Sequence, residues 1–204
     1  MSINNLAGVR KEDCAVIIID MQNDFLLKGA PIECPGGVEI ISNIQRLRVW
    51  AEENEIPVFF TQEMHRRQKV DFGLELIRNE PEHCLEGTRG VEIISDLTPR
   101  DNEFVLIKRR YSGYYLTDLE FLMRSFNRRV LIITGVATNV CVYATALDAV
   151  QRDVQPVVIS DGVAGTSVEL HKAFLQNIDY VIGDVVSLRS EEHTSELQSR
   201  VSIS

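Results

Sequence analysis

The segment that decides the fold is Leu131-Ile132-Ile133-Thr134-Gly135-Val136-Ala137-Thr138-Asn139-Val140-Cys141-Val142, which joins an apolar run to a helical pattern through one short turn. The residues before Gly135 are typical of a buried parallel strand, because both faces of such a strand are covered. Beyond the turn, apolar residues recur at the spacing of a buried helix face, at Val140, Ala144, Leu147 and Val150. The segment therefore predicts a strand, a tight turn and a helix.

Cys141 falls in the first turn of this predicted helix. Unpaired backbone N–H groups and the positive end of the helix dipole lower the pKa of a thiol there and favour the nucleophilic thiolate. A cysteine in an arbitrary position is more often a small buried hydrophobic residue. Its place at a strand-to-helix turn makes Cys141 a candidate nucleophile.

Strands alternate with helices along the rest of the chain. Further strands are predicted at 14–20, 56–61, 103–108, 156–160 and 180–182, and the principal helices at 38–53, 117–126 and 168–177. This alternation predicts an α/β fold with a doubly wound, mostly parallel sheet and helices on both faces, in which ligands bind outside the carboxyl ends of the strands. Asp20, Lys108 and Cys141 each lie at or just beyond such an end, so we expect them to meet at one edge.

Composition narrows the classes of protein. The 204 residues are 45% hydrophobic with a formal net charge of −9, which predicts one globular domain over 1–187 and argues against nucleic-acid or membrane partners. Four cysteines without paired spacing, and no visible targeting signal, predict a cytoplasmic protein. From about 188 the periodicity is lost and the sequence resembles the translation of a sequencing-library adapter, so 188–204 is expected to be a non-native tail.

Three motifs resemble the isochorismatase-like cysteine hydrolase family, which includes nicotinamidases, N-carbamoylsarcosine amidases, ureidoacrylate amidohydrolases and biuret hydrolases. They are Ile19-Asp20-Met21-Gln22-Asn23-Asp24-Phe25, Lys108-Arg109-Arg110-Tyr111-Ser112 with Tyr114 and Thr117, and Gly135 to Val142. The resemblance implies that Asp20, Lys108 and Cys141 form a catalytic triad and that the peptide bond between Val136 and Ala137 is cis. It also implies an oxyanion hole made by the backbone N–H groups of Ala137 and Cys141. Relatives of this kind commonly form homodimers or homotetramers.

The residue types permit a definite chemistry. Asp20 can accept the thiol proton while the Lys108 ammonium stabilises the thiolate, which then attacks a carbonyl. Asp20 next returns the proton to the departing amine, and water hydrolyses the thioester. We therefore expect a cysteine-dependent amidohydrolase that acts on a small amide, carbamoyl or ureido compound, releases ammonia and needs no cofactor.

Five further residues are candidates for substrate binding, each with a structural alternative. Phe25 and Tyr114 line the pocket or belong to the core, and Gln62 contacts an amide or faces solvent. Thr138 and Asn139 are most simply N-cap residues of the predicted helix, with any substrate contact secondary.

The expected absence of a metal is a departure from nicotinamidases, which carry an aspartate and histidines after the second strand. This chain has Gln62-Glu63-Met64-His65 there, and its next histidine is His83. Glu63 and the two histidines could ligate an ion, but unpatterned surface histidines are the simpler interpretation. The lack of the nicotinamidase pattern after the second strand favours a carbamoyl or ureido substrate over nicotinamide. The alternatives are a nicotinamidase, an isochorismatase-type hydrolase, or an inactive binding protein of the same fold.

Overall fold

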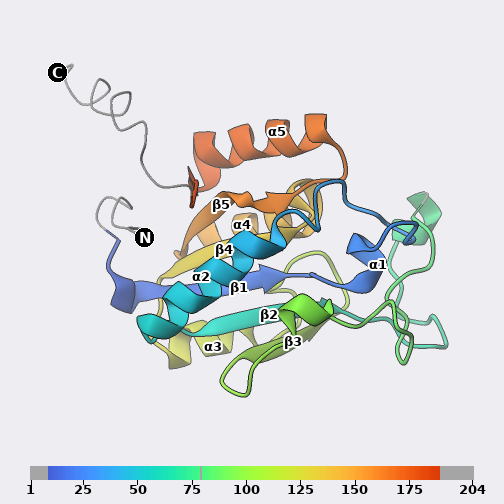
Figure 1. Ribbon diagram of the computed structural model, residues 1–204, viewed down its shortest axis with the longest axis horizontal. Helices are drawn as coiled ribbons and strands as arrows, with labels where there is room; N and C mark the ends of the chain where they lie inside the picture. The colour runs from blue at the N-terminus through green and yellow to red at the C-terminus, as the bar shows by residue number, and fades with distance from the viewer. Residues whose placement is uncertain (1–8, 79, 189–204) are drawn as a thin grey trace.

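A six-stranded, fully parallel sheet forms the centre of the protein (Figure 1). The computed structural model describes residues 9–78 and 80–188. The strand order is β3-β2-β1-β4-β5-β6. The strands are β1 (Cys14–Ile19), β2 (Val58–Glu63), β3 (Phe104–Lys108), β4 (Val130–Val136), β5 (Gln155–Ala164) and β6 (Asp184–Val186). The predicted doubly wound α/β class is confirmed.

Helices cover both faces of the sheet (Figure 1). One face packs against α2 (Ile41–Glu53), and the other packs against α3 (Leu119–Ser125) and α4 (Tyr143–Val150). The two remaining helices are α1 (Asn23–Leu26) and α5 (Val168–Asn177). Shorter turns of 3-10 helix occupy Lys11–Asp13, Glu75–Arg78 and Ser95–Leu97, and π-helical turns occupy Thr138–Val142 and Ile178–Ile182.

The central strand β1 explains why the sheet has two cores. All six of its residues are buried, and successive side chains of a strand point to opposite faces. Val16 and Ile18 therefore pack with the α2 core, whereas Ile17 and Ile19 pack with the α3 and α4 core. The carboxyl ends of the strands meet at one edge, where α1 and the loops after β2 also lie (Figure 1).

The final strand was predicted wrongly. The segment Ile178–Ile182 is a π-helical turn, and the last strand, β6, begins at Asp184. Ile178 and Ile182 are buried four residues apart, whereas Tyr180 and Val181 are exposed, which is a helical pattern. The apolar residues Tyr180 and Val181 suggested a strand, but neither side chain is buried in the core.

Strand β5 is longer than predicted. Asp161 and Gly162, expected to form a turn, lie inside β5, where the pairing with β4 shifts register between Ile133 and Gly135. Leu188, placed in the expected tail, is buried, and its backbone N–H donates to Asp161 Oδ1 at 2.8 Å. The rest of the expected tail, 189–204, lies outside the described residues.

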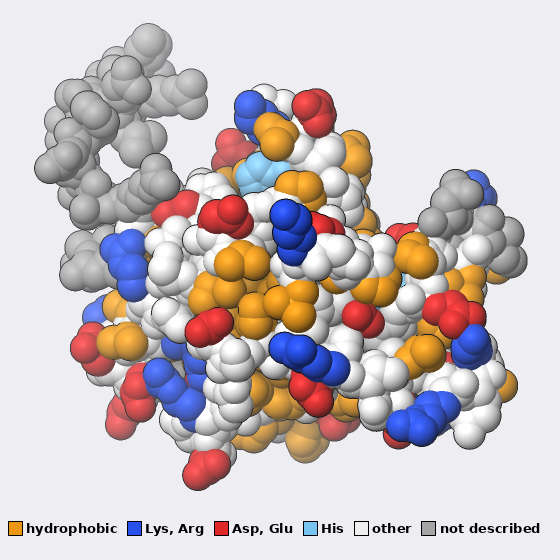
Figure 2. Space-filling view, turned by 45° about the vertical axis from the view of Figure 1, so that its right-hand side comes forward, with side chains coloured by type: hydrophobic (Ala, Val, Ile, Leu, Met, Phe, Trp, Pro, Cys, Tyr) orange, Lys and Arg blue, Asp and Glu red, His pale blue; other side chains and the backbone are white. Residues whose placement is uncertain are grey.

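The surface carries charges of both signs. Figure 2 shows acidic and basic side chains interspersed over the face it draws, with hydrophobic side chains gathered near its middle. Within the described part of the chain, no helix is long and apolar enough to cross a membrane.

Candidate active site

The side chains of Asp20, Lys108 and Cys141 meet at the carboxyl edge of the sheet. Lys108 Nζ lies 2.8 Å from Asp20 Oδ2 and 3.6 Å from Cys141 Sγ. Asp20 directly follows β1, Lys108 ends β3, and Cys141 lies in the π-helical turn after β4. Because β2 lies between β3 and β1, the four-carbon stem of Lys108 has to cross the end of β2 to reach the other two residues.

This group of three is shielded from water. Relative exposure is 1% for Asp20, 1% for Lys108 and 6% for Cys141. A buried charge costs several kcal/mol unless it is paired and hydrogen-bonded. Asp20 meets this requirement because Lys108 contacts Oδ2, and the Thr61 hydroxyl donates to Oδ1 at 2.8 Å. Buried ionisable groups of this kind are typical of reactive sites, whereas a structural core has no need of them.

The thiol of Cys141 differs from the expectation for a helix start. Burial raises the pKa of Cys141 well above its usual range, the Lys108 ammonium opposes this, and the negative charges of Asp20 and Glu63 add to it. The expected lowering of this pKa by the helix terminus is wrong, because desolvation by burial outweighs it. Cys141 therefore rests as a thiol that needs a base.

Asp20 is suited to be that base. Burial raises the pKa of the Asp20 carboxyl, Lys108 opposes the rise, and Glu63 adds to it. A carboxylate with a raised pKa is a stronger base than an ordinary aspartate. Burial lowers the pKa of Lys108, but the neighbouring negative groups outweigh it and hold the pKa well above its usual range, so Lys108 stays charged.

The turn that carries Cys141 depends on Gly135. Its φ is +104°, and a Cβ there would lie 2.1 Å from the Ile19 carbonyl oxygen, so only glycine fits beside β1. The peptide bond between Val136 and Ala137 is cis. Ala137 also precedes the π-helical turn as its N-cap residue, and its carbonyl accepts from the N–H groups of Val140 and Val142.

Thr138 and Asn139 do not cap this turn with their side chains, contrary to the prediction. Thr138 Oγ1 lies 2.9 Å from His171 Nδ1, and Asn139 Nδ2 donates to Thr166 Oγ1 at 2.8 Å. Both side chains therefore tie the turn to α5 and to the segment just before it. The oxyanion hole of Ala137 and Cys141 stays a prediction.

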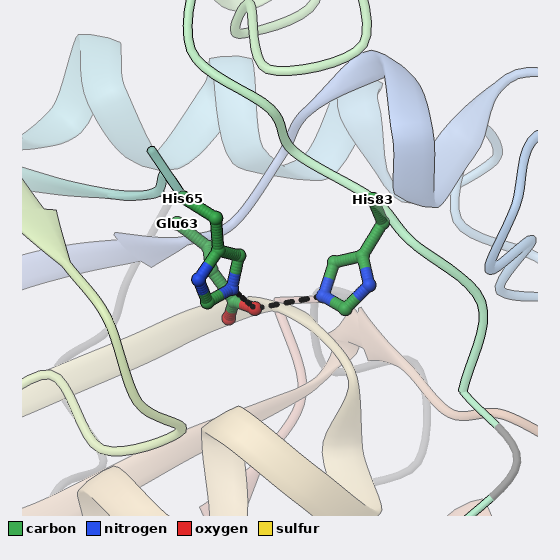
Figure 3. A group of neighbouring side chains, drawn as sticks. All are labelled: Glu63, His65 and His83. Atoms are coloured by element: carbon green, nitrogen blue, oxygen red, sulfur yellow. Dashed lines mark hydrogen bonds and ion pairs between the residues drawn. The ribbon is translucent and has the colours of Figure 1, made fainter. Parts of the chain in front are cut away.

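A second buried group adjoins the first through Glu63, the last residue of β2. Glu63 Oε2 lies 2.5 Å from Lys108 Nζ, and Oε1 lies 2.9 Å from His83 Nε2 and 3.3 Å from His65 Nε2. Figure 3 shows both imidazoles directed at the same carboxylate. The prediction of surface histidines is wrong, since His65 is 0% and His83 3% exposed.

The charge of Glu63 is maintained by its partners. Burial raises the pKa of this carboxyl, but Lys108 and the hydrogen bonds from His65 and His83 outweigh burial and hold the pKa well below its usual range. His83 Nδ1 donates to the Pro81 carbonyl at 2.8 Å, which turns Nε2 toward Glu63. Burial lowers the pKa of His83, but its contacts with Glu63 and Pro81 outweigh burial, so the pKa of His83 is raised overall.

Glu63, His65 and His83 could also hold a metal ion. Their ligand atoms lie within 4.8 Å of one another, and two imidazole nitrogens with one carboxylate match the donors that zinc accepts. The hydrogen bond from His83 Nδ1 to a backbone carbonyl is the kind that orients a ligating imidazole. The donor set therefore fits a divalent ion, although Glu63 also contacts Lys108 with its other oxygen.

A cavity opens onto Cys141. Phe25 lines it as proposed from the sequence, together with Asp20 and both residues of the cis peptide. Gln62, Tyr114, Thr138 and Asn139 are not among its lining residues. Gln62 Nε2 donates to the Val91 carbonyl at 2.7 Å, and the Tyr114 ring lies under the Arg152 guanidinium at 4.8 Å.

Sequence reasoning did not place several of the lining residues in the cavity: Ile32, Cys34, Glu63, Glu80, Tyr111 and Thr166. Glu63 could have been found, because it pairs in register with Lys108 at the ends of neighbouring strands. The predicted second strand ended at Thr61, two residues short of β2, and this hid the pairing. Glu80 and Tyr111 lie in irregular segments, where no periodic signal places a side chain.

A parallel α/β sheet with a buried thiol, carboxylate and ammonium at its carboxyl edge offers a nucleophile, a base and a cation at one site. The Isochorismatase domain family matches residues 14–190. The chain therefore belongs to the isochorismatase family of hydrolases.

Three relatives illustrate the range of this family. The chain is 32% identical to a probable inactive nicotinamidase of Arabidopsis thaliana over 80% of this chain and 87% of the relative. It is 31% identical to the N-carbamoylsarcosine amidase of an Arthrobacter species, over 86% of this chain and 69% of the relative. It is also 31% identical to enterobactin synthase component B of Escherichia coli, covering 83% of this chain but only 58% of that protein.

Solved structures share the fold. An isochorismatase-like hydrolase from Alkaliphilus metalliredigens superposes with a TM-score of 0.79 at 35% identity, over 86% of this chain and 94% of the other. A pyrazinamidase of Pyrococcus horikoshii in complex with zinc has a TM-score of 0.78 at 28% identity, over 86% of this chain and 99% of the other.

Proposed function

We propose that this protein is a cysteine-dependent amidohydrolase that cleaves a C–N bond of a small amide, carbamoyl or ureido compound. The observation that carries the proposal is the position of Lys108 Nζ, 2.8 Å from the Asp20 carboxylate and 3.6 Å from Cys141 Sγ. A fixed ammonium beside a thiol and a base stabilises negative charge on sulfur at the moment it forms.

The reaction would begin with transfer of the Cys141 proton to Asp20. The thiolate attacks the substrate carbonyl, forming a C–S bond and moving the carbonyl electron pair onto oxygen. The backbone N–H groups of Ala137 and Cys141 are the proposed donors to this oxyanion. When the C–N bond breaks, Asp20 gives its proton to the nitrogen, which leaves as ammonia or an amine.

The second half of the reaction releases the acid. Asp20, again a carboxylate, takes a proton from water as the hydroxide attacks the thioester carbonyl. The C–S bond breaks, and the proton returns to Cys141. Lys108 faces the sulfur in both halves and keeps the charge balanced. Where a divalent ion binds, Glu63, His65 and His83 would hold it, and it would supply a Lewis acid at the edge of the cavity.

The test is ammonia release from a panel of small amides, ureas and carbamoyl compounds. The wild-type protein should release ammonia from at least one compound, and Cys141→Ala should lose this activity while its circular dichroism spectrum is unchanged. Cys14→Ala is the matched control, because it also removes a buried thiol, at the amino end of β1. Retained turnover in Cys141→Ala would refute a thiol nucleophile.

Nicotinamide deamidation is a second candidate, favoured by the Glu63, His65 and His83 donor set. It predicts a bound divalent ion in the purified protein and release of ammonia from nicotinamide. Elemental analysis together with a nicotinamide assay separates it from the first candidate, which predicts higher kcat/KM for a carbamoyl or ureido compound.

A further inference from the structure

The hydroxyl of Thr61 contacts Asp20 at two points. Thr61 lies in β2 beside Ile19, the residue before Asp20, and is fully buried. Its hydroxyl donates to Asp20 Oδ1 at 2.8 Å, and its oxygen accepts from the Asp20 N–H at 3.1 Å. Asp20 has a φ of +50°, and in this left-handed conformation its N–H and its carboxylate reach the same hydroxyl. Thr61 is therefore bound to the proposed base both as donor and as acceptor.

The direction of the hydrogen bond to Oδ1 follows from the charge of Asp20. An ionised carboxylate only accepts hydrogen bonds, so the Thr61 hydroxyl has to be the donor. A proton placed on Oδ1 would displace this bond, whereas a proton placed on Oδ2 leaves it intact. The contact with Thr61 therefore favours Oδ2 as the oxygen that takes up a proton.

Asp20 Oδ2 is also well placed for proton transfer. It lies 2.8 Å from Lys108 Nζ, and a carboxylate oxygen of Asp20 lies within 4.8 Å of Cys141 Sγ. A carboxylate oxygen has two lone pairs, so Oδ2 can face the ammonium and still accept the thiol proton.

The carboxylate would lose this arrangement if it rotated freely. The terminal torsion of an aspartate has a broad range, and rotation about it would exchange Oδ1 with Oδ2 or turn both away from the sulfur. Thr61 holds one oxygen and Lys108 holds the other. Thr61 is not among the lining residues of the cavity, so it can affect a substrate only through Asp20.

We propose that Thr61 is a positioning residue that holds Asp20 Oδ1, so that Oδ2 carries the proton between Cys141 and the leaving nitrogen. This inference rests on the proposed thiol chemistry and assigns its proton transfer to one oxygen. Misplacement of a reacting group by about 1 Å costs up to about 100-fold in rate. Loss of the Thr61 hydroxyl should therefore lower kcat and leave KM nearly unchanged.

The first experiment removes and restores the hydroxyl. Thr61→Val has the shape of threonine without the hydroxyl, and the Asp20 N–H keeps the Thr61 carbonyl as an acceptor at 3.3 Å. We expect kcat to fall about 10- to 100-fold with little change in KM. Thr61→Ser keeps the hydroxyl and should retain most of kcat. If Thr61→Val does not fold, Thr61→Ala removes the same hydroxyl without placing a methyl group beside the carboxylate.

Thr134→Val is the matched control. Thr134 is fully buried in β4, and its hydroxyl donates to the Ile17 carbonyl at 3.2 Å, so this variant also removes one buried hydrogen bond between neighbouring strands. Its kcat should stay near that of the wild-type protein, and urea unfolding shows whether each variant is folded. A fall in kcat as large as that of Thr61→Val would overturn the proposal, because any lost buried hydrogen bond would then be sufficient.

The second experiment asks whether Thr61 acts through Asp20. Iodoacetamide forms a C–S bond with the thiolate of Cys141 as iodide leaves, and peptide mass spectrometry follows its rate at neutral pH. Thr61→Val and Asp20→Asn should each slow this labelling, because the base is misplaced or absent. In the double variant, Thr61→Val should add little to the effect of Asp20→Asn, since residues that act as a unit are not additive.

The outcomes separate this inference from the proposed function. Losses that multiply in the double variant, or unchanged kcat and labelling in Thr61→Val, would overturn the role of Thr61 and leave the cysteine chemistry standing. A wild-type protein that neither reacts with iodoacetamide at Cys141 nor releases ammonia from any compound of the panel would refute the proposed function and this inference with it.

Discussion

Two groups of buried side chains meet at Lys108, and they differ in what they offer to a substrate. On one side lie Asp20 and Cys141, which both line the cavity and can exchange a proton. On the other lies Glu63 with His65 and His83, joined by hydrogen bonds to one carboxylate (Figure 3). Asp20 and Cys141 can each change charge during a reaction, because a proton can pass between them. In the second group, Glu63 stays a carboxylate, because its partners hold its pKa well below the usual range.

The contrast between the two groups explains how a buried ammonium is kept beside a thiol. Lys108 alone would lose much of its stabilising effect if it rotated away from Sγ, and its long side chain has many rotamers. Glu63 Oε2, at 2.5 Å, fixes the ammonium between strands, and the histidines fix Glu63 in turn. Substitution of Asp20 or Cys141 should therefore abolish turnover. Substitution in the second group, Glu63 with its two histidines, should only reduce turnover.

Removing the shared residue should give the largest effect. Lys108→Met leaves the Asp20 and Glu63 carboxylates buried without their cation, which should cost about 3–5 kcal/mol of unfolding free energy. Turnover should fall on the order of 10⁴-fold, the scale of losing a triad member. Urea unfolding and ammonia assays measure both, and Lys69→Met, at an exposed ion pair, is the control. Wild-type turnover in Lys108→Met would contradict the central role of this ammonium.

Asp20→Asn should separate proton transfer from thiol reactivity. The variant cannot protonate the leaving nitrogen, so turnover should fall about 1,000-fold. Without this base the thiol should also react more slowly with iodoacetamide at neutral pH, but by less than turnover falls, because loss of the Asp20 charge lowers the pKa of Cys141. If labelling and turnover instead fall in parallel, Asp20 acts only by activating the thiol.

Glu63→Gln tests the second group. The neutral amide still reaches Lys108 but holds it less firmly, so kcat should fall about 10-fold with little change in KM. Glu63→Asp keeps the charge but is one methylene shorter, and we expect it to lose contact with Lys108 or with the histidines. Kinetics of both variants on one substrate decide the point, since unchanged kcat in both would show that Glu63 does not position Lys108.

The pH dependence of stability gives Glu63 a separate signature. Its pKa is well below the ordinary value of 4.5, so the unfolded chain binds more protons than the folded one below pH 4.5. The stability from the Glu63 charge is present above pH 4.5 and is lost as the pH falls through the folded pKa. Urea unfolding at pH 7 and pH 3 should show a destabilisation by Glu63→Gln that shrinks at pH 3. An equal difference at both pH values would contradict this.

His83→Gln should have the smallest effect of these changes. It removes one hydrogen bond to Glu63 Oε1 while His65 keeps the other, so the unfolding free energy should fall about 1–3 kcal/mol. Turnover should fall less than in Glu63→Gln. A loss of turnover larger than that of Lys108→Met would show that His83 takes part in the chemistry or holds a required ion, and elemental analysis of the variant would distinguish these.

The first group, Asp20, Lys108 and Cys141, could be predicted from the sequence. Asp20, Lys108 and Cys141 follow regular strands, and a parallel sheet brings the ends of its strands together, so their meeting point followed from periodicity alone. The family resemblance pointed to the cis bond at Val136 and Ala137, which no propensity rule reveals. The strand periodicity and the family motif could both be read because each lies in a short, regular segment of the sequence.

The second group was hidden for physical reasons. His83 lies in the irregular segment after β2, where burial depends on tertiary packing that no spacing encodes. Glu63 lies in a strand, but a charged residue at a strand end is as typical of solvent as of a buried pair. The thiol pKa was misjudged similarly, because a helix terminus is visible in the sequence and the degree of burial is not.

The covalent intermediate on Cys141 can be trapped directly. The protein is mixed with its best amide or urea substrate, quenched in acid during steady state, digested, and analysed by mass spectrometry. The thioester mechanism predicts an acyl or carbamoyl mass on the peptide that contains Cys141, absent from Cys141→Ala and increased when hydrolysis of the thioester is slowed. Sustained turnover with no adduct on Cys141, or with the adduct on another residue, would contradict it.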